Sequence, residues 1–196
     1  MTIRVSPSAE NVPGVSGQSG KFLTTDGKSL SWNAPNSITS LASGNIAASA
    51  TGLDISSISD SYTNLILYLD NLSATATGNI QLRFNNQSTG SNYSSGYIKS
   101  GSTPSNNTNQ GQNQALIGQF DSATQAGNGI ILTVFDYTNA TNSSSKMFSF
   151  VGTAQDNAMV YGTGVWRTTN TAINQIQILT SSGTFDTGTY RLFGVK

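Results

Sequence analysis

The densest group of side chains suited to binding a ligand lies between residues 83 and 93. An arginine is followed by amides and closed by an aromatic ring, in the order Arg83, Asn85, Asn86, Gln87, Asn92 and Tyr93. Amide and guanidinium groups can orient sugar hydroxyls beside an apolar or aromatic surface. The segment is therefore a candidate carbohydrate-binding site. The competing interpretation, which the frequency of asparagine in turns favours, is a turn whose side chains bond their own backbone, with Tyr93 in the core.

Two other segments carry weaker signs of recognition chemistry. Trp166 is followed by Arg167 at the end of an apolar run, where the indole is either a core or interface residue or a platform for stacking. Residues 100–113 make up a long segment that is polar and uncharged, and we expect this segment to form a loop. Serine, glycine and asparagine supply adaptable hydrogen bonding in recognition loops, but this segment has no aromatic anchor.

The residues that usually carry catalysis are missing or scattered. The chain has no histidine and no cysteine, which removes the commonest general base, the thiol nucleophile and the thiolate metal site. Glu10 is the single glutamate, and the aspartates lie singly, mostly in turns. Asp54 and Asp60 are close in sequence, and a fold could bring Asp121, Asp136, Asp156 and Asp186 together. Glycosidases need two carboxylates set a short distance apart. We therefore expect no enzymatic activity, no cofactor and no metal site.

The composition narrows the class of partner. Charged residues make up 9% of the 196-residue chain, and the formal net charge is zero. Nucleic acids and anionic membranes both attract a basic patch, so neither is an expected partner. The first residues contain no apolar core of a secretory signal, and no apolar run reaches transmembrane length. Seven tyrosines, eight phenylalanines and two tryptophans in regular apolar runs indicate a folded chain rather than a disordered one.

The apolar runs from Ser37 onwards alternate as β-strands do, and no run has helical spacing. In residues 62–72, Leu65, Leu67 and Leu69 point to one face, while residues 129–137 are apolar on both faces and predict a central strand. The predicted strands are 40–50, 53–57, 62–72, 79–84, 92–99, 114–120, 129–137, 146–153, 158–166, 173–179 and 190–195. The first two of these segments, 40–50 and 53–57, are short, Ala/Ser-rich and only weakly patterned. Roughly eight to ten strands with polar loops predict an antiparallel β-sandwich resembling a jelly roll.

The first 36 residues have a different organisation. Ile3 and Val5 alternate with polar residues before prolines interrupt the pattern, and Asp26-Gly27 lies between two short apolar segments, as in a hairpin with a type I′ turn. A two-stranded ribbon is marginal in water by itself. We therefore expect residues 1–36 to be an arm and hairpin attached to a larger assembly, and residues 37–196 to be the head. The predicted contacts with other chains are Ile3, Val5, Phe22, Leu23, Leu30 and Trp32.

The hairpin segment also carries a family resemblance. SGKFLTTDGKSLSW, residues 19–32, resembles a segment found near the N-terminal side of tail-fibre and related virion proteins of tailed bacteriophages. GTYRLFGVK, residues 188–196, is similar to the closing strand of phage β-sandwich heads, and RFNNQSTGSNY, residues 83–93, to a strand-and-loop unit of the same group. The resemblance implies a trimeric virion structural protein, made in the host cytoplasm and fixed to other virion proteins by its N-terminal arm.

Three functions follow as expectations. The first is a trimeric tail-fibre or receptor-binding protein that adheres to the host surface, where glycans are candidate partners. The second is a trimeric capsid decoration or head-fibre protein, which would share the fold and composition. The third, outside virions, is a bacterial carbohydrate-binding module, against which the hairpin resemblance counts.

Overall fold

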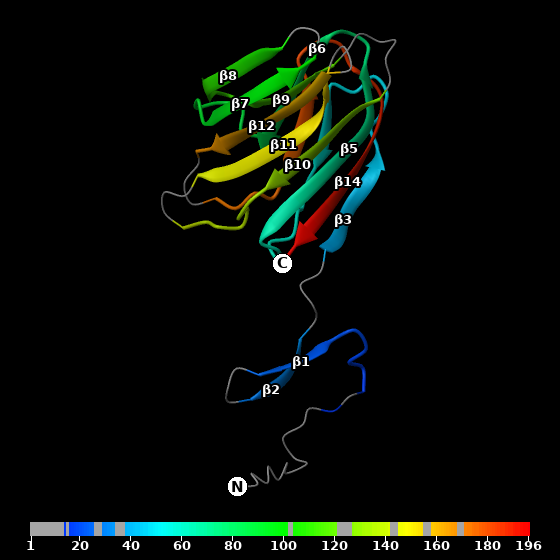
Figure 1. Ribbon diagram of the computed structural model, residues 1–196, viewed down its shortest axis with the longest axis vertical. Coiled ribbons are helices and arrows are strands. Elements are labelled where there is room, and N and C mark those ends of the chain that lie inside the picture. The colour runs from blue at the N-terminus through cyan, green and yellow to red at the C-terminus, as the bar shows by residue number, and fades with distance from the viewer. Residues whose placement is uncertain are drawn as a thin grey trace. The chain divides into compact units, whose positions relative to one another are not determined.

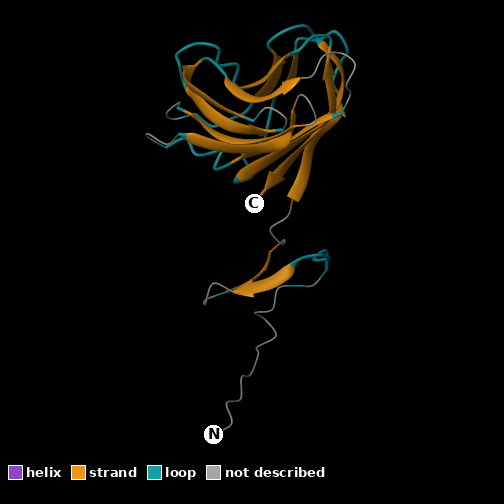
Figure 2. Ribbon diagram, turned by 45° about the horizontal axis from the view of Figure 1, so that its top comes forward, coloured by secondary structure: helices purple, strands orange, loops and turns teal. Residues whose placement is uncertain are grey.

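The computed structural model describes residue 14 and residues 16–25, 29–33, 38–101, 104–120, 127–141, 145–154, 158–167 and 171–196, with Asn33 and Ala154 described by their backbone only. Contacts between Cα atoms divide the chain into two units, Met1–Ser37 and Ile38–Lys196. The predicted contact residues Ile3 and Val5 lie outside the described residues. The described part of the chain contains strands and no helix (Figure 2).

The expected hairpin is present in the first unit. Strand β1 (Phe22–Thr25) pairs antiparallel with β2 (Leu30–Asn33), and Leu23 lies opposite Trp32. Because side chains alternate along a strand, Leu23, Leu30 and Trp32 share one face of the ribbon, whereas Phe22 is on the other. The last described pair of the ribbon is Thr25 with Leu30. Asp26 and Gly27 themselves lie outside the described residues.

The second unit is a sandwich of two antiparallel sheets. The large sheet has the order β3-β14-β5-β10-β11-β12-β7-β8 (Figure 1). The small sheet has the order β4-β13-β6-β9. The strands are β3 (Ile38–Asn45), β4 (Gly52–Ile55), β5 (Asn64–Ala74), β6 (Gly78–Phe84), β7 (Tyr93–Ser100), β8 (Ser105–Gln112), β9 (Ala115–Phe120), β10 (Asn128–Val134), β11 (Lys146–Ala154), β12 (Ala158–Trp166), β13 (Ile176–Thr180) and β14 (Phe185–Val195). The predicted all-β sandwich is confirmed, and the narrower expectation of a jelly roll stays a prediction.

Alternating side chains on facing strands build the core between the sheets. Leu65, Leu67 and Leu69 of β5 are buried as the period of two requires, and β10 lies inside the large sheet between β5 and β11. An aromatic cluster ties the two sheets together. The ring of Phe84 on β6 lies 5.5 Å from that of Trp166 on β12 and 5.9 Å from that of Phe148 on β11, between centroids. Trp166 is therefore a core residue, with its indole buried.

The sequence prediction missed one strand of the large sheet. Residues 105–112, expected to belong to a loop, form β8, which pairs with β7 at the edge of the sheet. The segment has no apolar alternation because most of its side chains are exposed, and the backbone of β7 supplies the pairing. Because β8 is polar, this edge of the sheet does not present an apolar strand with which another chain could aggregate.

Candidate functional site

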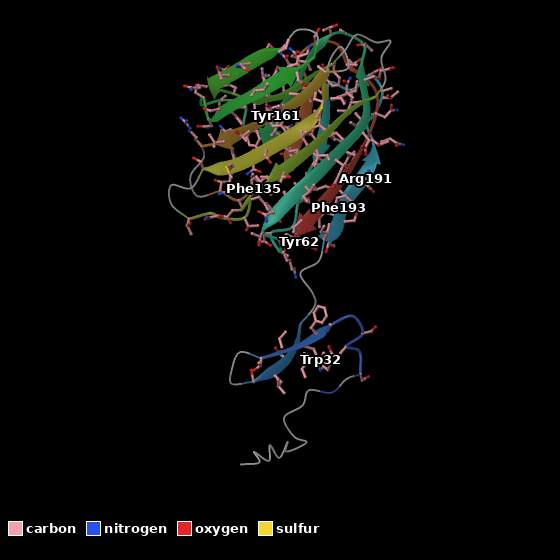
Figure 3. All side chains as sticks on the ribbon, viewed as in Figure 1. Trp32, Tyr62, Phe135, Tyr161, Arg191 and Phe193 are labelled. Carbon is pink, nitrogen blue, oxygen red and sulfur yellow. The ribbon has the colours of Figure 1, made fainter. Side chains whose placement is uncertain are left out.

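The outer face of the large sheet carries most of the exposed apolar side chains of the head. Ile98, Ile131, Met147, Val151, Met159 and Tyr161 all point away from the core. They come from β7, β10, β11 and β12, which are neighbours in the sheet. Figure 3 places Tyr161, Phe135, Arg191 and Phe193 over this sheet. Large exposed apolar surfaces on a folded domain mark sites of interaction.

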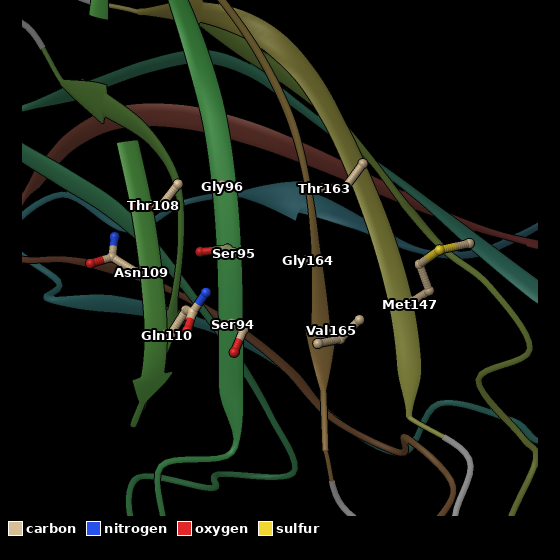
Figure 4. A pocket seen from close by; sticks show the side chains of 10 residues that line it. All are labelled: Ser94, Ser95, Gly96, Thr108, Asn109, Gln110, Met147, Thr163, Gly164 and Val165. Carbon is tan, nitrogen blue, oxygen red and sulfur yellow. The ribbon is translucent and has the colours of Figure 1, made fainter. Parts of the chain in front are cut away.

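A groove runs along β7 on this face. We call it the β7 groove, and define it by the outward residues Ser94, Gly96 and Ile98 of β7, Asn106, Thr108 and Gln110 of β8, Tyr161, Thr163 and Val165 of β12, and Met147 of β11. The register places Gly96 directly between Thr108 on one neighbouring strand and Thr163 on the other. Figure 4 shows these two threonines flanking the bare backbone of Gly96. The groove exists because two outward residues of β7, Ser94 and Gly96, are smaller than their neighbours on β8 and β12.

The two walls of the β7 groove differ in chemistry. The β8 wall has the amides of Asn106 and Gln110 and the hydroxyl of Thr108, all exposed. The opposite wall is more apolar, with Tyr161 and Met147 each half exposed. Two open hollows of about 290 and 390 Å³ make up the groove, and they share Gly96, Thr108 and Thr163. Such a groove can hold an extended ligand by hydrogen bonds on one side and apolar contact on the other.

A third hollow lies towards the other half of the same face. It measures about 610 Å³ and is lined by Ile131, Val151 and Met159, with Tyr68, Asp70 and Arg191 at its side. The Arg191 guanidinium pairs with the Asp70 carboxylate at 2.9 Å and lies 5.5 Å from the centre of the Tyr68 ring. This central hollow is more apolar than the two hollows of the β7 groove. The charged side chains that line it, Asp70 and Arg191, are paired with each other.

The structure does not gather the predicted sugar-binding residues into one exposed site. Tyr93 is completely buried, and its hydroxyl accepts a hydrogen bond from the Phe84 backbone N–H at 2.7 Å. Its ring therefore offers no face to a ligand. Burial raises the pKa of Tyr93 to about 12, an effect that the hydrogen bond from Phe84 and the nearby Arg83 charge only partly offset.

The side-chain amide of Asn85 is bonded to the protein backbone and is not free to bind a ligand. Its side chain donates to the carbonyl of Ala172 at 2.7 Å and accepts from the backbone N–H groups of Asn174 and Gln175 at 2.9 and 3.1 Å. Asn85 and Asn86 both have positive φ angles, of 51° and 55°. This is the turn chemistry of asparagine that the sequence had offered as the alternative. Gln87 likewise donates to the carbonyl of Thr89, and Asn92 is half-buried.

Arg83 belongs to a polar row on the outer face of the small sheet. Its Nε donates to Gln114 Oε1 at 3.0 Å, so its guanidinium is held within the sheet face. Across the same row, Gln177 Nε2 donates to Asp54 Oδ1 at 2.6 Å. The six residues proposed as a sugar site are thus spread over the core, a structural turn and this row, and the proposal that they bind a glycan stays a prediction.

The remaining titratable groups that the structure describes are mostly exposed and lie singly. Among the residues that the structure describes, no group of three acidic side chains is placed to hold a metal ion. Asp54, Asp60, Asp136 and Asp186 are exposed, whereas Asp121 and Asp156 lie outside the described residues. Lys146 is buried at the start of β11, where burial lowers the pKa of its ammonium and the Asp136 charge raises it less. Its Nζ donates to the carbonyl of Asn139.

The sequence held one signal for the β7 groove. Tyr93 and Tyr97 are large residues at inward positions, and the two outward positions between them, Ser94 and Gly96, are small. Identifying the walls, however, required the order of β8, β7 and β12. The polar segment 105–112, expected to be a loop, had no sequence feature that placed it beside β7.

Comparisons with protein-family models, with curated proteins and with solved structures found no match. No helix in the described part of the chain is long and apolar enough to cross a membrane.

Proposed function

We propose that the chain is a structural protein of a tailed-bacteriophage virion, a trimeric tail-fibre or receptor-binding protein that adheres to the host surface. In this proposal the N-terminal unit fastens the protein to the virion and to its own copies, and the sandwich presents a binding face. Adhesion by a homotrimer suits shallow sites, because linked weak contacts gain avidity without any additional contact.

The exposed apolar hairpin is the observation that carries the proposal. Phe22 is 62% exposed, Leu23 43% and Leu30 39%, on a two-stranded ribbon. Such a ribbon is only marginally stable without a covering surface. Copies of the chain or neighbouring virion proteins would supply that surface. The resemblance of residues 19–32 to phage virion proteins favours the same interpretation.

Three measurements test the proposal. Sedimentation of the full chain is expected to give a trimer, and a stable monomer would contradict the assembly part of the proposal. Binding of the fluorescently labelled full chain to intact cells of the bacterial host tests adhesion. Electron microscopy of gold-labelled virions then separates the two virion locations. Label at the tail supports the receptor-binding role, whereas label on the capsid facets would replace it with the decoration role.

A further inference from the structure

We propose that the β7 groove binds a neutral, linear oligosaccharide, lying along β7 between β8 and β12. The inference rests on the proposed adhesive function and assigns the ligand class and the site within it. It moves the binding site from residues 83–93, where the sequence had placed it, to the outer face of the other sheet.

The dimensions of the groove suit one extended chain. Neighbouring strands lie about 4.8 Å apart, so β8 and β12 are separated by roughly 10 Å across β7. Thr108 and Thr163 lie on either side of Gly96 in the register, and Gly96 has no side chain to fill the space between them. The small residues Ser94 and Gly96 form about 7 Å of the floor along the strand, and Ile98 continues it with an apolar side chain. A narrow open groove of this length accepts a short run of sugar rings arranged along the strand.

The walls match the two kinds of surface that a sugar presents. Sugar hydroxyls need donors and acceptors, which the amides of Asn106 and Gln110 and the hydroxyl of Thr108 provide. The C–H faces of the rings need apolar contact, which Tyr161 and Met147 provide from the other side, each 50% exposed. A wholly apolar ligand would leave the amides of the β8 wall without hydrogen-bond partners. Such a ligand would fit the more apolar central hollow better than the β7 groove.

The absence of charge specifies the class of glycan. No charged side chain lines either hollow of the groove in the described part of the chain. Carboxylates of uronic or sialic acids are held best by arginine or lysine. An acidic sugar would lose hydration in the groove without gaining such a partner, so neutral sugars are preferred.

Binding of oligosaccharides to the full-length protein tests the inference. The probes are neutral linear oligosaccharides built from glucose, galactose, mannose or N-acetylglucosamine, together with a matched panel containing uronic and sialic acids. The protein is expected to bind at least one neutral probe and to bind the acidic panel at least tenfold more weakly. Binding of no neutral probe, or equal binding of the acidic panel, would overturn the inference.

Two variants place the ligand in the groove. Tyr161→Ala removes half-exposed apolar surface and is expected to weaken binding of the neutral probe about tenfold or more, since this is the aromatic residue of the wall. Gly96→Ala puts a methyl group on the floor and is expected to weaken it similarly. An added Cβ there would lie 3.4 Å from the Asn107 carbonyl oxygen and 3.7 Å from Thr108 Cγ2, so the fold tolerates it. Ile38→Ala, an exposed apolar site at the opposite edge of the sheet, is the matched control and should bind normally.

The outcomes separate this inference from the function on which it rests. If the wild-type chain adheres to host cells and both groove variants adhere equally well, the groove assignment is wrong while the adhesive function stands. If the wild-type chain does not adhere to host cells at all, the proposed function itself fails. If Tyr161→Ala or Gly96→Ala instead converts the oligomer into monomers, the groove is a contact between copies, which also overturns the inference. Should Gly96→Ala fail to fold, Tyr161→Ala and Asn106→Ala, both at exposed side chains, carry the test.

Discussion

The hydroxyl of Tyr93 accepts a hydrogen bond from the backbone N–H of Phe84 at 2.7 Å, and the two residues belong to different sheets. Tyr93 is on β7 of the large sheet and Phe84 on β6 of the small one. The Tyr93 ring also lies 6.4 Å from that of Trp166, nearly parallel to it. The Tyr93 side chain therefore joins the sheets by a polar contact within the apolar core. It lies on the inner face of β7, the strand whose outer face carries the β7 groove.

Replacing Tyr93 by phenylalanine tests the value of that contact. Tyr93→Phe keeps the ring but leaves the buried Phe84 N–H without the hydroxyl, which costs about 1–3 kcal/mol of unfolding free energy. Urea denaturation should show a lower midpoint with an unchanged slope. Tyr161→Phe, which removes a hydroxyl from an exposed ring, is the control and should leave the midpoint unchanged. Equal midpoints for Tyr93→Phe and the wild type would mean that the hydrogen bond contributes nothing.

The same tyrosine makes stability fall at alkaline pH. Its pKa is raised from 10.0 to about 12 by burial, so the folded state keeps the proton at a pH where the unfolded state releases it. The contribution is complete below pH 10 and is lost as pH rises from 10 towards 12. Burial raises the pKa of Tyr97 and Tyr137 in the same direction. The urea midpoint of the wild type should therefore decline above pH 10, and that of Tyr93→Phe should decline less steeply over the same range.

Glycines on the two faces of the large sheet are expected to differ in their tolerance of a methyl group. A Cβ on Gly152 of β11 would overlap the backbone carbonyl oxygen of Gly129 and approach Ile130 to 3.0 Å. Gly152→Ala should therefore lower stability by about 1–3 kcal/mol or more, as overpacking does. Gly96→Ala meets only ordinary contacts and should stay within about 0.5 kcal/mol of the wild type. Thermal unfolding of the two variants measures this contrast, and similar melting temperatures would contradict it.

The strands that could be predicted from the sequence are those in which apolar residues alternate with other residues, so that the buried face can be recognised. Leu65, Leu67 and Leu69 identified β5 and its inward face, and the doubly apolar run of β10 identified a strand inside the sheet. Strand β8 was not predicted, because its extended conformation depends on pairing with β7. Such a tertiary contact leaves no pattern in the local sequence. Tertiary packing of this kind regularly overrides local preference.

The candidate site was harder to predict than the fold, for a related reason. The turn at Asn85 and Asn86 and the row at Arg83 look from the sequence like a single polar cluster, but strand alternation sends Arg83 outward and Tyr93 inward. The β7 groove, in contrast, combines Thr108, Gly96 and Thr163 from three strands. Their adjacency depends on sheet order, which the sequence alone did not determine.

The apolar face of the hairpin provides the last prediction. Leu23 and Leu30 share a face with Trp32, whereas Phe22 lies on the opposite face. If copies of the chain cover the Trp32 face, as we propose, replacing Leu23 and Leu30 together by serine removes two apolar side chains from each contact. We expect this double variant to dissociate to monomers at concentrations where the wild type sediments as a trimer, with a dissociation constant raised at least tenfold.

The comparison variant is Phe22→Ser, which alters the other face of the same ribbon. Retention of the trimer by Phe22→Ser and its loss in the double variant would place the contact on the Trp32 face. Dissociation by both variants would instead require that both faces are covered, by two neighbours rather than one. A trimer unaffected by either variant would contradict the inference that the hairpin holds the copies together, because the exposed apolar area of Phe22, Leu23 and Leu30 would then contribute nothing to assembly.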